Sequence, residues 1–174
     1  PKVGEPNPIV TLGVVPAIGG TTKWANVARY PAADRLIAAV SWSPDSRDVV
    51  FQAQNRAQTW LDVNSADAAT GATRTLFREP SRAWVSDTAD PIWLGDGSFL
   101  WLSERSGYRH LYLYGSDGRL RRQVTSGPWE VRSLYGVDEA GGWMVVAGSV
   151  PPFARLIVWL ELSPQPVDHG SAAS

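Results

Sequence analysis

The chain has 174 residues, of which 44% are hydrophobic and 19% charged, a balance typical of a globular protein with a core. The formal net charge of −1 excludes a general attraction to nucleic acid or anionic lipid, and the absence of cysteine excludes disulfides, thiolate nucleophiles and cysteine-rich zinc sites. Nine Trp, thirteen Pro and sixteen Gly indicate strands and turns, so the composition favours an all-β fold. No apolar stretch approaches the length of a transmembrane helix.

The first strands are expected near the N-terminus. Residues 9–15 and 21–27 are short apolar segments that resemble the third and fourth strands of a repeating unit. The chain begins at Pro1 rather than Met and ends in a small-residue tail, 170–174. We therefore expect an excised piece of a longer protein, whose targeting signal lies outside this sequence.

A β-hairpin pattern then occurs three times, each copy with an apolar strand, an acidic turn containing Gly, Pro or Ser, and a second apolar strand. The turn acids Asp45 and Asp96 are 51 residues apart, and Asp96 and Glu139 are 43 apart. These intervals bracket the period of a four-stranded propeller blade. The three hairpins span residues 40–53, 91–103 and 134–147.

The segments after the hairpins also repeat. A third strand is expected at 58–63, 109–114 and 156–161, and a more polar fourth strand at 72–77 and 119–124. Asp117-Gly118 is a strong signal for a two-residue hairpin turn between the third and fourth strands. The fourth strand is an exposed rim, where charges discourage edge-to-edge pairing. In one unit these charges are Arg119, Arg121 and Arg122.

The sequence therefore predicts an all-β fold of antiparallel four-stranded blades, a partial β-propeller of about three to four blades. The propeller is expected over 1–162 and a flexible C-terminal tail over 163–174. A β-sandwich or an ordinary antiparallel meander is the alternative. The expected blade pieces are about 1–30, 35–80, 88–126 and 130–162.

Catalytic machinery is not expected. No Gly-x-Ser-x-Gly occurs, and the two His are far apart: His110 reads as a hydrogen-bonded strand residue and His169 lies in the tail. The pair Asp138-Glu139 sits where the other repeats have turn-capping acids, and Gly95-Asp96-Gly97-Ser98 reads as a hairpin turn rather than a phosphate loop. Glu104-Arg105 is expected to be an exposed ion pair or a loop anchor. We predict no catalytic, metal or cofactor-binding residue, and no substrate-binding residue can be assigned.

The tryptophans fall mostly in strands at repeat-related positions, so we expect them to fill the space between blades rather than to bind ligands. Trp84 is the exception to follow, because it lies in the segment that links one blade to the next. The nine are Trp24, Trp42, Trp60, Trp84, Trp93, Trp101, Trp129, Trp143 and Trp159.

The segments 99–114 and 123–131, with the Trp84-Val85 pair, resemble the propeller of the dipeptidyl peptidase IV family of the prolyl oligopeptidase clan. The opening residues 1–10 resemble a segment leading out of an earlier blade of that family, and the resemblance covers most of 1–162 in the same order. It implies an eight-bladed propeller joined to a C-terminal α/β-hydrolase domain that holds Ser, Asp and His and releases N-terminal dipeptides.

The family's acidic Glu-Glu pair has no counterpart, because the chain contains no Glu-Glu dipeptide. The loop 86–90 also lacks the aromatic residue and the Arg that some members place near the substrate.

The resemblance implies a function in which this part of the propeller shapes and gates access to the hydrolase domain, with a peptide substrate and that domain as partners. The parent is expected to be a serine peptidase, bacterial, and periplasmic or cytoplasmic. The first alternative is a non-enzymatic, TolB-like propeller that binds a protein partner. A carbohydrate-active propeller would need inward-facing carboxylates that the sequence does not identify. An open arc exposes apolar end faces, so the isolated fragment is expected to self-associate.

Overall fold

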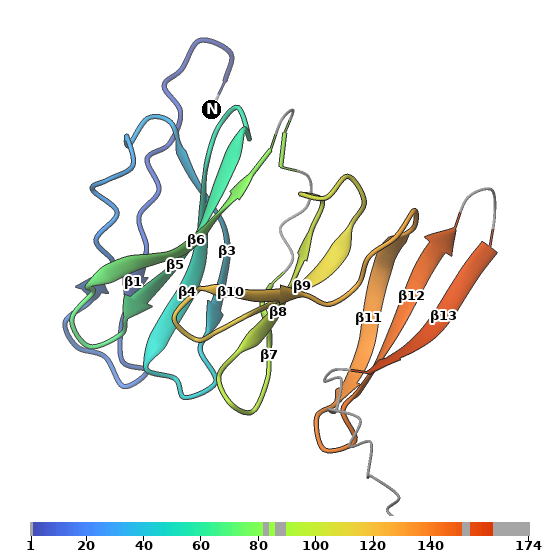
Figure 1. Cartoon of the computed structure of the whole chain (residues 1–174). Coiled ribbons are helices and arrows are strands. Elements are labelled where there is room, and N and C mark those ends of the chain that lie inside the picture. The colour runs from blue at the N-terminus through green and yellow to red at the C-terminus, as the bar shows by residue number, and fades with distance from the viewer. Residues whose placement is uncertain (1, 82–83, 86–89, 151–153, 162–174) are drawn as a thin grey trace, which may run out of the picture.

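The computed structural model describes residues 2–81, 84–85, 90–150 and 154–161, and every regular element in these ranges is a β-strand. The strands form four separate antiparallel sheets, each made of consecutive strands (Figure 1). We number the sheets 1 to 4 in chain order and call the space between two successive sheets a seam. In the described part of the chain no helix could span a membrane.

Sheets 2 and 3 are complete four-stranded blades whose strands pair in chain order. Tight turns need the left-handed backbone conformation, which Gly97 and Gly118 adopt in sheet 3 and Gly71 adopts between the third and fourth strands of sheet 2. Sheet 2 consists of β3 (Arg35–Trp42), β4 (Asp48–Asn55), β5 (Trp60–Asp67) and β6 (Thr73–Pro80); sheet 3 consists of β7 (Ile92–Trp93), β8 (Phe99–Ser103), β9 (His110–Tyr114) and β10 (Leu120–Gln123).

Sheets 1 and 4 contain fewer strands. Sheet 1 is the pair β1 (Gly13–Val14) and β2 (Lys23–Trp24), which lies within the two expected segments 9–15 and 21–27 but is much shorter than either. Sheet 4 has three strands, β11 (Glu130–Asp138), β12 (Trp143–Val150) and β13 (Ala154–Glu161).

Because the strands of sheets 2 and 3 are antiparallel, their connections lie alternately at the two ends of each sheet. The tight turns β3–β4, β5–β6, β7–β8 and β9–β10 lie at one end, which we call the turn end. The β4–β5 and β8–β9 loops and the segments between sheets lie at the other, the linker end.

The core consists of three apolar layers, one in each seam. Alternate residues of β8 point to opposite seams: Phe99 and Trp101 pack against sheet 2, whereas Leu100 packs against sheet 4. In β4, Phe51 faces sheet 1 and Val50 faces sheet 3. Sheets 2 and 3 therefore each bury both faces.

Burial of both faces separates this fold from a sandwich, in which each of two sheets buries one face and exposes the other. The predicted all-β class of antiparallel four-stranded blades, part of a β-propeller, is confirmed. The division into a propeller over 1–162 and a tail over 163–174 stays a prediction, because 162–174 lie outside the described residues.

An aromatic stack fills the seam between sheets 2 and 3. The Phe77 ring of β6 lies 4.3 Å from that of Tyr114 and 5.2 Å from that of Trp101, between ring centroids. The rings of Phe99 and Tyr114 are nearly parallel, with centroids 5.3 Å apart. Burial raises the pKa of the Tyr114 hydroxyl, although nearby Arg105 opposes the shift. Such pairs add about 0.5–1.5 kcal/mol each beyond the apolar area that they bury.

Two turn glycines bring neighbouring sheets into backbone contact. A Cβ added at Gly71 would lie 2.1 Å from the Trp24 carbonyl oxygen of sheet 1, and one at Gly118 would lie 2.4 Å from the Leu76 carbonyl oxygen of sheet 2. Gly71 and Gly118 occupy equivalent turns of successive sheets, between the third and fourth strands. The turn therefore sets how closely each sheet approaches the preceding one.

Replacement of Gly118 by Ala tests this contact. Gly97→Ala is the matched control, because both residues have a positive φ (81° and 78°) but the nearest atom to a Cβ at Gly97 is 3.7 Å away. In both variants the strained backbone conformation should lower the free energy of unfolding by about 1–2 kcal/mol. In Gly118→Ala the clash with Leu76 should lower it by about 2 kcal/mol more. Urea unfolding measures both, and equal losses would contradict the close approach.

Candidate functional site

The acidic turn residues mainly cap their own turns, as the sequence indicates. Asp45 accepts hydrogen bonds from the Ser43 hydroxyl (2.7 Å) and the Arg47 amide (3.1 Å), and Asp96 accepts one from the Ser98 amide (2.8 Å). These bonds lower the pKa of both carboxyls, with the Ser43 hydroxyl as the main cause at Asp45 and the Ser98 hydroxyl at Asp96. Both groups are exposed, so they are solvated anions rather than general acids.

Glu139 differs from the other turn acids. Its carboxylate reaches across the seam and accepts the Gly95 amide at 2.8 and 3.0 Å, so it joins the turn of sheet 4 to the turn of sheet 3. Its neighbour Asp138 caps its own turn through the Gly141 amide at 2.9 Å. The adjacent pair Asp138-Glu139 is thus divided between two structural tasks and does not form a paired-carboxylate site.

An open hollow of about 590 Å³ lies between the turns of sheets 2 and 3. Every carboxylate in its lining already accepts a hydrogen bond from a serine hydroxyl or a backbone amide. Four carboxylates and one guanidinium make the hollow a solvated, acidic surface with no catalytic constellation. They are Asp45, Asp48, Asp96, Asp117 and Arg74.

Glu79 is a buried carboxylate in the seam between sheets 2 and 3. It lies at the end of β6 and accepts hydrogen bonds from the Trp101 indole (3.1 Å), the Ser103 hydroxyl (2.5 Å) and the Arg105 guanidinium (2.6 Å) of sheet 3. Arg105 also lies over the Tyr112 ring, 4.7 Å from its centroid. Burial is the largest single influence and lowers the pKa of Arg105, but Glu79 and Tyr114 together outweigh it, so the pKa is raised. Arg105 is thus a loop anchor, one of the two roles that the sequence suggests for Glu104-Arg105.

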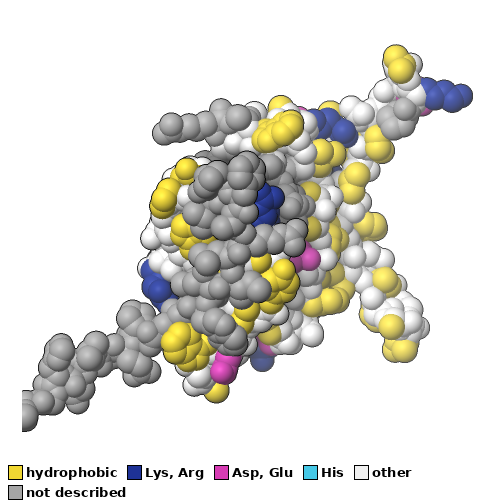
Figure 2. Space-filling view, turned by 90° about the vertical axis from the view of Figure 1, so that its right-hand side faces the viewer, with side chains coloured by type: hydrophobic (Ala, Val, Ile, Leu, Met, Phe, Trp, Pro, Cys, Tyr) yellow, Lys and Arg dark blue, Asp and Glu magenta, His cyan; other side chains and the backbone are white. Residues whose placement is uncertain are grey.

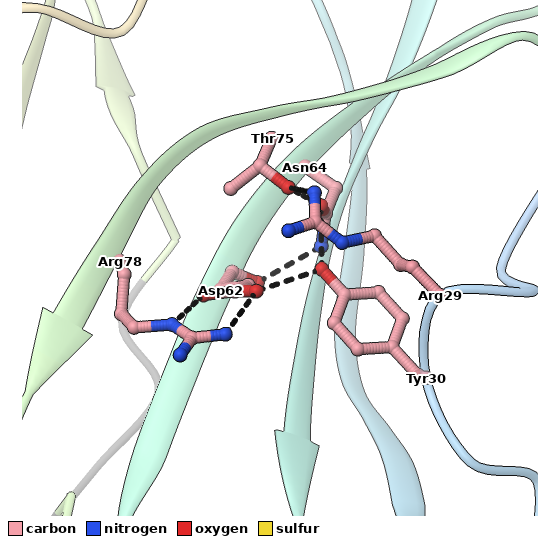
Figure 3. Close-up of polar contacts among 6 residues, drawn as sticks. All are labelled: Arg29, Tyr30, Asp62, Asn64, Thr75 and Arg78. Carbon is pink, nitrogen blue, oxygen red and sulfur yellow. Dashed lines mark hydrogen bonds and ion pairs between the residues drawn. The ribbon is translucent and has the colours of Figure 1, made fainter.

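A second buried carboxylate, Asp62 of β5, faces the opposite seam (Figure 3). Arg78 of β6 binds both its oxygens, at 2.6 and 2.9 Å, and the Tyr30 hydroxyl donates to it at 2.9 Å. Tyr30 belongs to the segment between sheets 1 and 2, and its hydroxyl also contacts Asn64 of β5. Arg29 bonds to Thr75 beside this group. Burial raises the pKa of Tyr30, which keeps its proton for the bond to Asp62.

The two buried carboxylates are unsuitable for acid–base catalysis. Each is already bound by an arginine and by further donors, so neither has a free oxygen in an accessible cleft. Sequence reasoning missed both Glu79 and Asp62. Asp62 gave a local signal, because it stands between the apolar Leu61 and Val63 and a charge in such a place is rarely buried without a partner. Glu79 gave none, because it follows Arg78 in a polar strand.

His110 has the structural role expected of it. It is buried, and its two ring nitrogens contact the Thr125 hydroxyl (3.0 Å) and the Gly127 carbonyl (3.1 Å). His169 lies outside the described residues. Within the described ranges no three His, Cys, Asp or Glu side chains are grouped so as to hold a metal ion.

The expectation for the tryptophans was only partly right. Trp60, Trp93, Trp101 and Trp129 pack in the seams. Four others are 44–66% exposed: Trp24, Trp42, Trp84 and Trp143. Trp42 shares its face of sheet 2 with Phe51, toward sheet 1, and the two short strands of sheet 1 leave it uncovered. The side chain of Trp159 lies outside the described residues.

Removal of a seam arginine should lower the free energy of unfolding far more than removal of a surface arginine. Arg105→Ala leaves Glu79 buried without its counter-ion, and loss of one partner of a buried pair costs about 3–5 kcal/mol. Arg47→Ala is the control, because the Arg47–Asp45 pair is exposed and screened by solvent and therefore adds little stability. Chemical unfolding should also show salt sensitivity for the exposed pair only. Equal losses would show that Glu79 does not depend on Arg105.

A family model and curated relatives agree on the family of this chain. The family model described as the dipeptidyl peptidase IV (DPP IV) N-terminal region matches residues 1–149. Two fungal proteins, each named "Probable dipeptidyl peptidase 4", are similar over 80% of the chain. The one from Aspergillus flavus is 30% identical over 148 residues, which cover 19% of its length. The one from Emericella nidulans is 28% identical over 151 residues, which cover 20% of its length.

The crystal structure of Porphyromonas gingivalis dipeptidyl peptidase 4 has a similar fold. It superposes with a TM-score of 0.81 and 24% identity, and the match covers 92% of this chain and 23% of that one. The chain spans about one fifth of the length of the curated relatives it matches. Its relatives include fungal and bacterial proteins, so the expected bacterial origin stays a prediction. Because the family model covers most of the sequence, the chain belongs to the family of dipeptidyl peptidase IV N-terminal regions.

Proposed function

We propose that this chain is part of the N-terminal propeller of a dipeptidyl-peptidase-IV-like serine peptidase. In that protein it shapes the substrate chamber and limits access to an α/β-hydrolase domain that supplies the catalytic Ser, Asp and His. The observation that carries the proposal is the family match over residues 1–149, on a chain folded as successive blades. The peptide substrate and the hydrolase domain are the proposed partners.

The polar interior of the chain agrees with a shaping role. The buried carboxylate Glu79 joins sheet 2 to sheet 3, and Asp62 joins sheet 2 to the segment that precedes it. Both carboxylates thereby fix neighbouring parts of the chain against sheet 2. Family membership favours this function over the alternative of a TolB-like binding module.

The proposal is tested by assaying the isolated chain beside the complete protein that contains it. With a chromogenic dipeptidyl substrate that has Pro in the second position, the complete protein should release the dipeptide and the isolated chain should not. A Ser→Ala change in a Gly-x-Ser-x-Gly motif beyond this sequence should abolish release. A complete protein without such a motif, or hydrolysis by the isolated chain, would contradict the proposal.

The isolated chain is also proposed to self-associate through the end faces of its arc. Trp42 and Val40 are about half exposed on the side of sheet 2 that sheet 1 leaves open, and Trp143 is 44% exposed on sheet 4. Figure 2 looks onto the sheet 4 end and shows hydrophobic side chains around the atoms that are not described. In a closed ring further blades would cover such faces.

Sedimentation velocity over a range of concentrations tests the self-association. The isolated chain should form dimers or larger species as its concentration rises. Trp42→Lys or Trp143→Lys should shift the population toward monomer, because a charge at the contact would have to be desolvated. Trp84→Lys is the control, since Trp84 is 66% exposed and its neighbour Val85 packs in the seam between sheets 2 and 3, away from the end faces. A wild-type monomer at high concentration would exclude this contact.

A further inference from the structure

Trp129 lies between two sheets, at the linker end of the seam between sheets 3 and 4. On one side its ring meets the His110 ring of β9 edge-on, with centroids 5.4 Å apart and an interplanar angle of 83°. On the other side it lies against Gly148 of β12, where an added Cβ would come within 2.7 Å of the indole ring. The ring is therefore closely packed between β9 and β12.

The Trp129 ring is also held along its own segment. Its indole nitrogen donates to the Ser126 carbonyl at 2.8 Å. Gly127, whose φ is 120°, allows this fold-back, since a Cβ there would lie 2.9 Å from the indole. The segment 125–129 and the ring thus form one compact unit between β10 and β11.

His110 attaches this unit to sheet 3 through both ring nitrogens. The Gly127 carbonyl can only accept a hydrogen bond, so its partner Nε2 carries the hydrogen. The Thr125 hydroxyl oxygen accepts the Leu111 amide at 3.0 Å and can donate its own hydrogen to Nδ1. His110 thereby holds the segment at two points, and the indole edge is fixed relative to β9.

We propose that Trp129 is a wedge that sets the angle between sheets 3 and 4, with His110 holding the wedge in place. Blades surround a common axis, so the angle at a seam sets how the inner strands β7 and β11 diverge. The inference concerns the packing of this chain alone and holds whether or not the proposed function does. If Trp129 were only core filling, a change at the seam would alter stability but not the angle.

Distance measurement between spin labels tests the wedge, and the absence of native cysteine lets labels be placed at will. The first distance, between labels at Ala57→Cys and Arg132→Cys, runs from sheet 2 to sheet 4. The second distance, between labels at Ala57→Cys and Tyr108→Cys, runs from sheet 2 to sheet 3. In Gly148→Ala the indole must move by about 1 Å to restore ordinary contact. The first distance should therefore lengthen by about 1–3 Å, since the displacement acts at one end of a strand. The second should not change.

Gly136→Ala is the matched control. Gly136 is a strand glycine of the same sheet, and a Cβ there would have no atom within 4 Å. It should leave both label distances unchanged. Trp129→Ala should broaden the first distance distribution and leave the second alone. Identical distributions in folded Gly148→Ala, Trp129→Ala and Gly136→Ala proteins would overturn the wedge.

A double-variant cycle of melting temperatures gives a second test, which does not depend on the label distances. Without the indole, an alanine at 148 no longer meets the ring, so Gly148→Ala should lower the melting temperature much less in a Trp129→Ala background than in the wild type. A smaller drop should remain in that background, because the added Cβ would still lie 3.1 Å from the Glu130 carbonyl oxygen. Additive drops would overturn the proposal, because they would mean that the Cβ and the ring do not oppose each other.

Discussion

Burial of both faces of a sheet is the constraint on which the rest of this structure depends. A blade of four strands has too little area to form a core alone, so it is stable only between two neighbours. In β8 this requirement is visible residue by residue, since Phe99 and Trp101 serve one seam and Leu100 the other. It also explains why apolar side chains are exposed where a neighbour is short, as at Trp42 beside the two-stranded sheet 1.

Apolar layers alone would tolerate sliding of one sheet over the next, and the buried carboxylates remove that freedom. Glu79 is satisfied only when the Trp101 indole, the Ser103 hydroxyl and Arg105 meet it together. Displacement by one residue would leave a buried charge without its partners, which costs several kcal/mol (about 3–5). Asp62 does the same at the other face of sheet 2 through Tyr30. Sheet 2 therefore fixes the position of chain segments on both of its sides.

Local features of the fold were predictable from the sequence, and relations between sheets were not. The turns at Asp45, Asp96 and Asp117-Gly118 depend on neighbouring residues, so the hairpins and their period could be inferred. Glu79 and Arg105 are brought together by the stacking of two sheets, and no local pattern encodes that pairing. The same limit explains the tryptophans: Trp42 and Trp93 hold equivalent places in their repeats, but only Trp93 has a complete blade beside it.

The seam between sheets 3 and 4 shows how two weak contacts can define an angle. At the turn end, Glu139 of sheet 4 binds the Gly95 amide of sheet 3, which fixes one point of contact. At the linker end the Val131 amide bonds to the Arg109 carbonyl at 2.7 Å, next to the ring of Trp129. Two sheets joined at both ends can rotate only if one contact gives way. A side chain that alters the spacing at one end therefore turns the sheet about the other end, and a shift of an ångström at Trp129 becomes a change in the shape of the arc.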